Sequence, residues 1–384
     1  MRPIGLRYSA FMTNVLVDGA AIVYRLFDVG YSIRLDDASR TIAESAPARV
    51  PARELPARVE ARALQIANPP LALSLGRAPL VIEGKSYDAE LSARLYDFGV
   101  CALRLKLDTP PGLSWQEFSL IGRALDTSGQ SGALMRDALN ELLARLQDAI
   151  ERPAIAPVVE EYAVFRVYRL CDEAGKLVSV DAIGDAHLVP LLLGEDRSLA
   201  ENARRELLQH RFSYYADDLA ILTWDNALVV DPNPHDRDVE YVLEFANAQL
   251  LELRMYDALL DAELPSMYDR VEVGRRRRLP LLTHGFRPII AALQTRVADV
   301  TETVERVDNA LKVTEDVYLA RIYAAALELF RGQTWRRGIE RKLAIFRETY
   351  AMLNAESQAS RAEVMEAAIV LLIVAELLVG LLRA

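Results

Sequence analysis

The C-terminal segment, residues 365–382, limits what this chain can fold into more than any other part of its sequence. Residues 367–375 and 377–382 are apolar, and Glu376 separates the two runs. A helix that is apolar on every face cannot lie half exposed in water. The segment must therefore be covered by lipid or by protein.

A membrane helix is the first interpretation of this segment. Its 18 residues, 365–382, span about 27 Å as a helix, which is barely enough for the hydrocarbon layer. Glu376 opposes insertion, because a carboxylate near mid-membrane costs about 2.5–3.5 kcal/mol. Protonation, a partner helix or tail-to-tail oligomerisation would lower that cost. The residues expected to form the anchor are Ile369, Leu372, Ile373, Glu376, Leu377 and Leu381.

The location expected from this interpretation is the inner or cytoplasmic membrane, with the body of the protein facing the cytoplasm. Residues 1–16 contain no continuous apolar run of the kind that a secretory signal needs. Lys342, Arg347 and Arg361 precede the segment, which agrees with the positive-inside rule. The alternative is a soluble homo-oligomer whose tail is buried in a subunit interface.

Composition and charge narrow the class of protein. The hydrophobic fraction of 52% and the charged fraction of 26% are those of a folded chain. A net charge of −10 argues against an extended nucleic-acid footprint and leaves only local basic patches open to nucleic acid. Cys101 and Cys171 lie in apolar, strand-like runs, so we expect buried free thiols.

Residues 1–235 predict an α/β sandwich-type region. Strand patterns occupy 20–35, 91–107 and 160–170, and residues 219–231 predict a hairpin. Six prolines make residues 46–80 a possible linker with a short helix, because proline fixes φ and removes a hydrogen-bond donor. These prolines are Pro47, Pro51, Pro56, Pro69, Pro70 and Pro79.

Within this region, residues 26–35 and 95–105 resemble each other. Each has an aromatic residue, an aspartate, an apolar residue and a glycine, followed by a strand-like run that ends in Arg-Leu. Glycine in such a place usually marks a bulge or the close approach of another backbone. The pattern predicts a duplicated strand motif, with chance similarity as the alternative.

Residues 236–364 predict long helices. One seam has spacings of three and four over Ile290, Leu293, Val297, Val300, Val304, Val307 and Leu311. A second seam comprises Ile339, Leu343, Phe346, Tyr350 and Leu353. The expected arrangement is an antiparallel coiled-coil hairpin or bundle that runs on into the hydrophobic C-terminal helix at 365–384, and self-association through the first seam is the alternative.

No catalytic, cofactor or metal motif is present in the sequence. His187, His210, His235 and His284 have none of the companions of a metal or nucleophile site, and residues 231–238 lack the glycine and the terminal glutamate of a calcium loop. We therefore expect no enzymatic activity and no cofactor, with a cryptic site in the α/β region as the alternative. Arg275, Arg276, Arg277 and Arg278 could contact lipid headgroups or RNA phosphate, or form a solvated loop.

From about Phe212 onward the chain resembles the "required for meiotic nuclear division" family. The resemblance rests on Asp217-Asp218-Leu219, on Glu244-Phe245-Ala246-Asn247-Ala248-Gln249-Leu250-Leu251-Glu252-Leu253, and on residues 366–376, in which Glu366 and Glu376 flank nine apolar residues. It implies membrane attachment, self-association and, in mitochondria, support of translation at the inner membrane. The resemblance also implies that Glu376 is shared by the family, whose hydrophobic C-terminal segment is interrupted by a glutamate.

Taken together, the sequence predicts an α+β fold and a membrane-anchored, non-enzymatic scaffold. The expected partners are membrane lipid, further copies of the chain bound through its helices, and a second protein.

Overall fold

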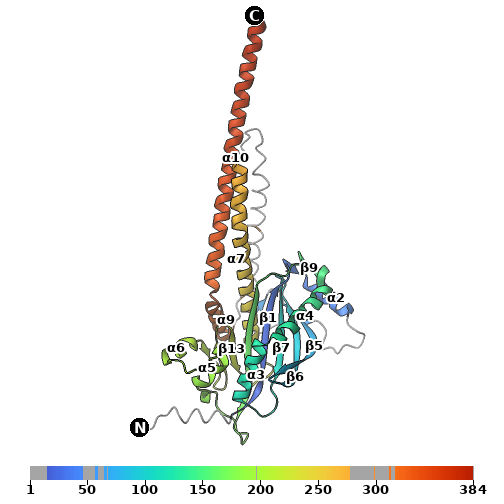
Figure 1. The fold of residues 1–384 in the computed structure, drawn as a ribbon, viewed down its shortest axis with the longest axis vertical. Coiled ribbons are helices and arrows are strands. Elements are labelled where there is room, and N and C mark those ends of the chain that lie inside the picture. The colour runs from blue at the N-terminus through green and yellow to red at the C-terminus, as the bar shows by residue number, and fades with distance from the viewer. Residues whose placement is uncertain are drawn as a thin grey trace. The chain divides into compact units, whose positions relative to one another are not determined.

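The computed structural model describes residues 15–45, 57–58, 65–66, 68–195, 197–276, 298, 311–312 and 316–383. Over these residues the protein is a mixed α+β structure with a large N-terminal sheet and a helical C-terminal half (Figure 1). The α+β class predicted from the sequence is confirmed at this level. The chain divides into two compact units: unit 1 is Met1–Glu252 with Val307–Gly332, and unit 2 is Leu253–Arg306 with Gln333–Ala384.

Unit 1 is built on a ten-stranded sheet in which β1 (Leu16–Asp28) pairs on one side with β7 (Val100–Asp108) and on the other with β10 (Val159–Cys171). The strand order is β11-β12-β13-β10-β1-β7-β6-β5-β3, and β8 pairs with β1. Neighbours are antiparallel except β10 and β13, which are parallel. The remaining strands of this sheet are β3 (Ala57–Arg58), β5 (Leu71–Ile82), β6 (Lys85–Leu95), β8 (Leu113–Ser114), β11 (Arg211–Phe212), β12 (Leu219–Leu222) and β13 (Asn226–Val230).

Two short strand pairs lie outside the large sheet. They are β2 (Ser32–Ile33) with β9 (Ile150–Glu151), and β4 (Gln65–Ile66) with β14 (Leu311–Lys312). The predicted hairpin at 219–231 is present as β12 and β13. The stretch 46–80, interpreted above as a possible linker, contains most of β5, a long strand that pairs with β6 along its whole length.

Helices α3 (Trp115–Thr127) and α4 (Gly129–Leu146) cover one face of this sheet (Figure 1). α3 begins at a capping box, in which the Ser114 hydroxyl accepts from the Glu117 backbone N–H and the Glu117 carboxylate accepts from the Ser114 backbone N–H. Side chains alternate between the two faces of a strand, and inward-facing residues such as Val23, Leu103 and Phe165 share an apolar core with these helices. The other helices of unit 1 are α2 (Leu35–Ser45), α5 (Asp185–Leu193), α6 (Glu201–Leu207) and α9 (Val317–Leu329).

The two similar segments found in the sequence lie directly against each other. The Val29 backbone N–H donates to the Gly99 carbonyl at 2.9 Å. Gly99 has a φ of +97°, and a Cβ on it would lie 2.0 Å from the Gly30 carbonyl oxygen. The close approach of another backbone that the glycine pattern predicted is confirmed.

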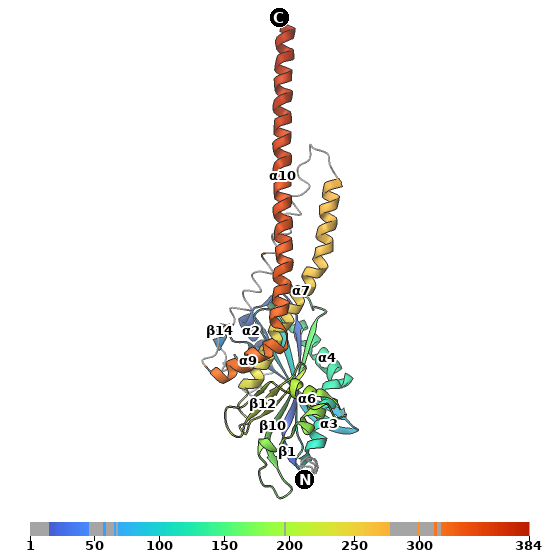
Figure 2. The ribbon, with the colours of Figure 1, turned by 90° about the vertical axis from the view of Figure 1, so that its left-hand side faces the viewer.

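Unit 2 contains residues 253–276 of α7 (Asp238–Arg276) and nearly all of α10 (Gly332–Arg383). Figure 2 shows α10 as one continuous helix that reaches the C-terminus. The second predicted seam is largely buried, since Ile339, Leu343, Phe346 and Leu353 form a core with residues of α7 that include Leu253, Tyr256, Leu260 and Met267.

Charged groups add to this helix contact. The Lys342 ammonium lies 2.6 Å from both the Asp257 and the Asp261 carboxylates. α7 and α10 run in the same direction (Figure 1), so the described residues show no antiparallel coiled-coil hairpin. The first predicted seam from Ile290 to Val307 lies outside the described residues.

The contact at Gly99 gives a stability prediction. Gly99→Ala should lower the free energy of unfolding by at least about 2 kcal/mol, because the new methyl group meets the Gly30 carbonyl and the backbone has a positive φ. Gly84→Ala is the matched control, since Gly84 has a φ of +74° and a Cβ added to it would meet no atom within 4 Å. It should cost only about 1 kcal/mol. Urea unfolding measures both, and equal losses would contradict the close approach.

Asp28 gives a prediction for pH. Burial raises the pKa of its carboxyl from 3.8 to about 6, although the Gly30 backbone N–H donates to the carboxylate at 3.1 Å and opposes the rise. The neutral carboxyl thus favours the folded state below about pH 4, and this contribution is lost as the pH rises through about 6.

We therefore expect Asp28→Asn to be more stable than the parent protein at pH 7, by up to about 3 kcal/mol, because the buried charge is gone. The advantage should shrink as the pH falls toward 4. Unfolding free energies measured at several pH values test this, with Asp137→Asn, at an exposed position on α4, as the control. Parallel pH profiles for the parent and Asp28→Asn would contradict the assignment.

Candidate interaction site

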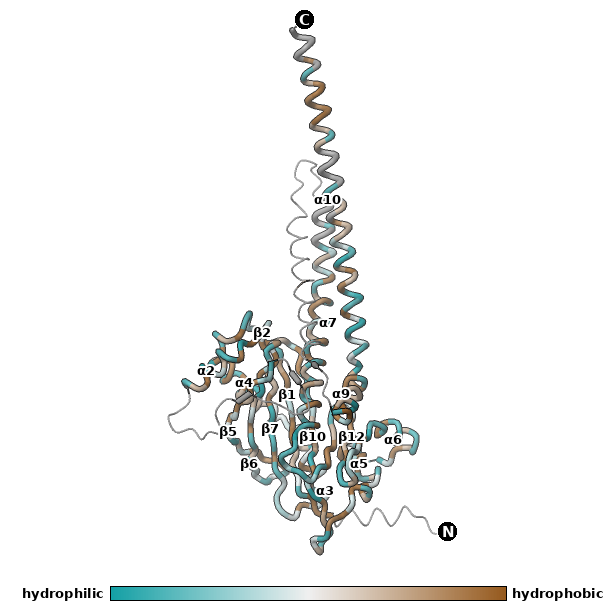
Figure 3. Tube along the Cα trace, turned by 180° about the vertical axis from the view of Figure 1, so that it is seen from behind, coloured by the Kyte–Doolittle hydropathy of each residue, from teal (hydrophilic) through white to brown (hydrophobic). Residues whose placement is uncertain are grey.

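Large exposed apolar side chains concentrate near the end of α10. Figure 3 shows this segment as the hydrophobic part of the helix close to the C-terminus. The exposed fractions of these residues range from 49% for Val374 to 71% for Leu371. The exposed residues are Met365, Ile369, Val370, Leu371, Leu372, Ile373, Val374 and Leu378. Since water disfavours such a surface, this segment is the first candidate for an interaction site.

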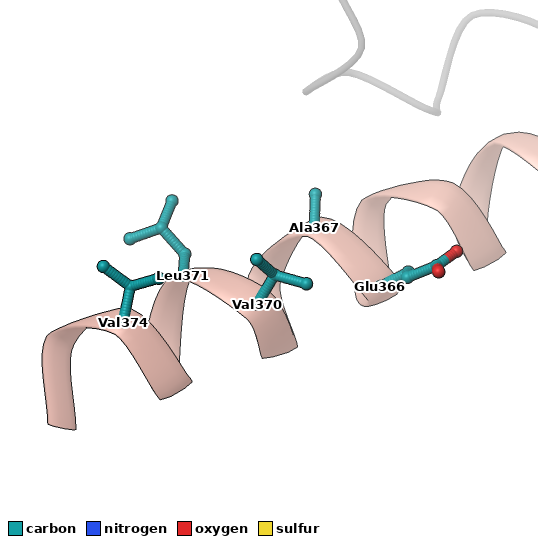
Figure 4. Close-up of a pocket in the computed structure, with 5 residues that line it drawn as sticks. All are labelled: Glu366, Ala367, Val370, Leu371 and Val374. Atoms are coloured by element: carbon teal, nitrogen blue, oxygen red, sulfur yellow. The ribbon is translucent and has the colours of Figure 1, made fainter. Parts of the chain in front are cut away.

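One face of the segment forms an apolar row. Glu366, Ala367, Val370, Leu371 and Val374 line an open hollow of about 540 Å³ (Figure 4). Ala367, Val370 and Val374 follow the spacing of three and four that continues in the sequence with Leu377 and Leu381; we call these five residues the tail seam. Glu376 is two residues beyond Val374, about 200° further round the helix, so its carboxylate lies away from the seam.

The predicted membrane anchor needs correction. In the part of the chain that the structure describes, no helix combines the length and the apolar character that crossing a membrane requires. Glu366 and Glu376 bracket nine apolar residues, 367–375, which span about 14 Å of helix against a hydrocarbon layer of about 30 Å. This finding overturns the anchor, the membrane location and the membrane-anchored scaffold predicted above.

The other predicted site residues are placed as follows. Ile369, Leu372, Ile373 and Glu376 lie on α10 with exposed side chains. Leu377 and Leu381 lie on the same helix, but their side chains are outside the described set. Leu311 belongs to the short strand β14, which pairs with β4. Arg275 and Arg276 are the last residues of α7, while Arg277 and Arg278 fall outside the described residues.

Chemistry-bearing groups of the described residues do not gather into a metal site. No cluster of three or more His, Cys, Asp or Glu side chains that could hold a metal ion occurs among them. Cys101 is buried, and burial, together with the negative charge of Glu244, raises the pKa of its thiol to about 12. A thiol in that state is a poor nucleophile at neutral pH.

A buried charged network occupies the second face of the sheet in unit 1, where the first turns of α7 lie. The Arg166 Nη1 atom is 2.5 Å from the Glu240 carboxylate, and its Nη2 atom donates to the Asn233 carbonyl at 2.9 Å. The Tyr24 hydroxyl donates to the same carboxylate at 3.3 Å. Arg104 adds longer ion pairs at 3.7 Å to Glu240 and to Glu90.

A second set of contacts lies one helical turn further along α7. The Glu244 carboxylate accepts from Arg94 at 2.5 Å and from the Tyr96 hydroxyl at 2.9 Å. The Arg94 guanidinium also lies 4.5 Å from the centre of the Tyr241 ring. Because Glu240 and Glu244 are four residues apart, they face the same side of α7 and meet neighbouring strands of the sheet.

Charge pairing decides the ionisation of Glu240. Burial by itself would raise the pKa of this carboxyl, but Arg104, Arg166 and Arg237 outweigh it and hold the pKa below its ordinary value. Glu240 is 2% exposed and Arg166 is 1% exposed. A buried pair of this kind tolerates the loss of one partner poorly, because the other charge is left without compensation.

Sequence reasoning did not identify this network. Arg94, Arg104 and Arg166 all lie within segments that were predicted to be strands, at positions where an apolar residue would be ordinary. The available signal was an arginine in a strand facing away from the apolar core, together with two glutamates four residues apart at the start of a helix. Neither pattern indicates which arginine pairs with which glutamate.

The comparison with protein families concerns most of unit 1. A family model described as "Uncharacterized protein MJ0711, N-terminal domain" matches residues 18–237, which is more than half of the chain. The chain belongs to this family. MJ0711 itself, from Methanocaldococcus jannaschii, is 24% identical over 196 residues, which are 51% of this chain and 59% of that protein. No solved structure matches the chain.

These comparisons overturn the resemblance to the "required for meiotic nuclear division" family. The family model places the chain with MJ0711, and nothing found points to the meiotic family. The resemblance rested on helix patterns and an apolar C-terminus. Any packed helix repeats apolar residues at spacings of three and four, so such patterns recur in unrelated proteins.

The MJ0711 match ends at residue 237, one residue before α7 begins. Arg94, Arg104 and Arg166 lie inside the matched region, whereas Glu240 and Glu244 lie outside it. The buried arginines of the sheet are thus paired with glutamates from a helix that the MJ0711 domain model does not include. This helix is nevertheless part of unit 1 as far as Glu252.

The network gives a further stability prediction. Glu240→Gln should lower the free energy of unfolding by about 3–5 kcal/mol, because the buried Arg166 then loses its close counter-charge and the Asp231 carboxylate lies 3.8 Å away. Glu90→Gln is the matched control: the Glu90 side chain is 42% exposed and pairs with Arg104 at 3.7 Å, so its loss should cost at most about 1 kcal/mol. Urea unfolding followed by tryptophan fluorescence distinguishes the two. Similar small losses would show that the network contributes little.

Proposed function

We propose that this protein is a non-enzymatic scaffold that self-associates through its C-terminal helix, with the tail seam packed against the tail seam of a second copy. The observation that carries the proposal is the exposure of eight large apolar side chains within residues 365–378 of α10. Lack of enzymatic activity is part of the proposal and is supported by the absence of a catalytic motif in the sequence.

The size of the apolar surface supports a second copy as the partner. Burying one Val, Leu or Ile side chain removes on the order of 100 Å² of apolar surface from water. The eight residues are roughly half exposed or more. Pairing two tail seams would cover Val370 and Val374 of this set in each copy, and association of more than two copies would cover the side chains on the other faces of the helix.

The position of the acidic residues also supports this pairing. Glu376 points away from the tail seam, and Glu366 lies at its edge. Two seams can then meet without burying the Glu376 carboxylate, which would be costly. A second copy supplies the same apolar spacing and therefore fits a seam of this pattern.

Analytical ultracentrifugation of the full chain at several concentrations tests the proposal. We expect the parent protein to sediment as a dimer or a larger oligomer, and Val370→Glu/Val374→Glu to sediment as a monomer, because two carboxylates would enter the seam. Leu120→Glu is the matched control, since Leu120 is 59% exposed on helix α3, and it should leave association unchanged.

Circular dichroism would show that each variant keeps its helix content. A parent protein that stays monomeric at all concentrations would overturn the proposal and indicate that another protein covers the segment. Unchanged association of the double variant would likewise overturn it, because a different surface would then hold the copies together.

A further inference from the structure

A cluster of three tyrosines lies in unit 1 between the loop after β11 and the start of α9. The ring centres of Tyr214 and Tyr215 are 4.9 Å apart with planes at 87°, and those of Tyr214 and Tyr318 are 5.7 Å apart at 52°. Tyr214 is 66% exposed and Tyr215 is 68% exposed. Exposed aromatic rings that cluster in this way mark a candidate interaction surface.

The backbone holds this cluster in place. The Asp218 carboxylate accepts from the Tyr214 backbone N–H at 2.8 Å, and the Ser213 hydroxyl donates to the Asp218 carbonyl at 3.0 Å. Asp316 caps α9 by accepting from the backbone N–H groups of Tyr318 and Leu319. The rings are thus supported on both sides by local hydrogen bonds, which lowers the entropy that a ligand would have to remove.

The surroundings of the rings are acidic. Burial raises the pKa of the Tyr318 hydroxyl, and the carboxylates of Asp218, Asp231, Asp316 and Asp236 raise it further. Asp217 is a further exposed carboxylate on the same loop. The Arg321 guanidinium lies over the Phe212 ring, 5.7 Å from its centre, so an arginine already binds an aromatic face next to this loop.

We propose that Tyr214, Tyr215 and Tyr318 form a binding site for the guanidinium group of an arginine, supplied by an arginine-rich segment of a partner protein. The faces of aromatic rings attract cations, and the planar guanidinium group can lie on an exposed ring face of the cluster. The nearby carboxylates add a favourable long-range attraction. This site is independent of the tail seam and does not rest on self-association.

The same rings could in principle stack on the bases of single-stranded nucleic acid. Proteins that bind in this way surround their aromatic residues with positive charge that follows the phosphate backbone. Here the carboxylates that act on Tyr318, those of Asp218, Asp231, Asp236 and Asp316, outnumber the nearby Arg321 guanidinium, and they repel phosphate. The electrostatics therefore favour a cationic peptide.

Isothermal titration of the full chain with a peptide of residues 272–281, which contains the run Arg275 to Arg278, tests the site. The same peptide with its four arginines replaced by glutamine is the ligand control. We expect binding of the arginine peptide only, and a loss of at least tenfold in affinity in Tyr214→Ala/Tyr215→Ala. Tyr268→Ala is the matched protein control, because Tyr268 is 55% exposed on α7, and its affinity should be unchanged.

Two further variants separate the contributions. Tyr214→Phe/Tyr215→Phe should keep the affinity, because the ring faces remain, while Asp217→Asn should weaken binding more at low salt than at high salt. Equal binding of the glutamine peptide, or unchanged affinity in the double alanine variant, would overturn the proposal. Tighter binding of an oligouridylate that is lost in the same variant would also overturn it, in favour of a nucleic-acid site.

Discussion

The buried pairing between the sheet and the first turns of α7 is the interaction on which unit 1 depends. Three arginines occupy the sheet face opposite α3 and α4, and they are far too costly to bury without counter-charges. Glu240 and Glu244 supply those charges from one side of a helix. The helix therefore belongs to the sheet domain although it follows the region that defines the MJ0711 family, and its position is set by charge as well as by apolar packing.

From this point α7 continues into unit 2, where its character changes. Its residues beyond Glu252 pack against α10 through apolar side chains, with Lys342 held between two aspartates. This packing against α7 does not extend along all of α10, because the described side chains of residues 365–376 are exposed. One helix thus carries apolar side chains that are buried against α7 and others that are exposed to solvent. Association is proposed at the exposed ones.

The two candidate surfaces differ in chemistry, and for this reason different partners are proposed for them. The tail seam offers only apolar contacts with its carboxylates at the edge or on the far side, and this suits an identical helix. The tyrosine cluster offers ring faces within an acidic field, and this suits a cation. A scaffold with one surface for its own copies and another for a basic partner is consistent with a chain in which the sequence shows no catalytic motif.

The sequence by itself determined the α+β class, the hairpin of β12 and β13 and the apolar seam of α10 that packs against α7. These features depend on periodicities and turn residues that act over a few positions. It also located the exposed apolar segment, but it assigned that segment to lipid, because an apolar helix has the same pattern whether lipid or protein covers it.

The tertiary structure alone decided the pairing of Arg166 with Glu240 and of Arg94 with Glu244, at separations of 74 and 150 residues. It also decided the direction of α10 relative to α7 within unit 2 and the meeting of Tyr214 with Tyr318. Residues this far apart in the sequence come into contact only through the tertiary fold of the whole chain. The arginines indicated only that counter-charges must exist, and the fold selected which glutamates supply them.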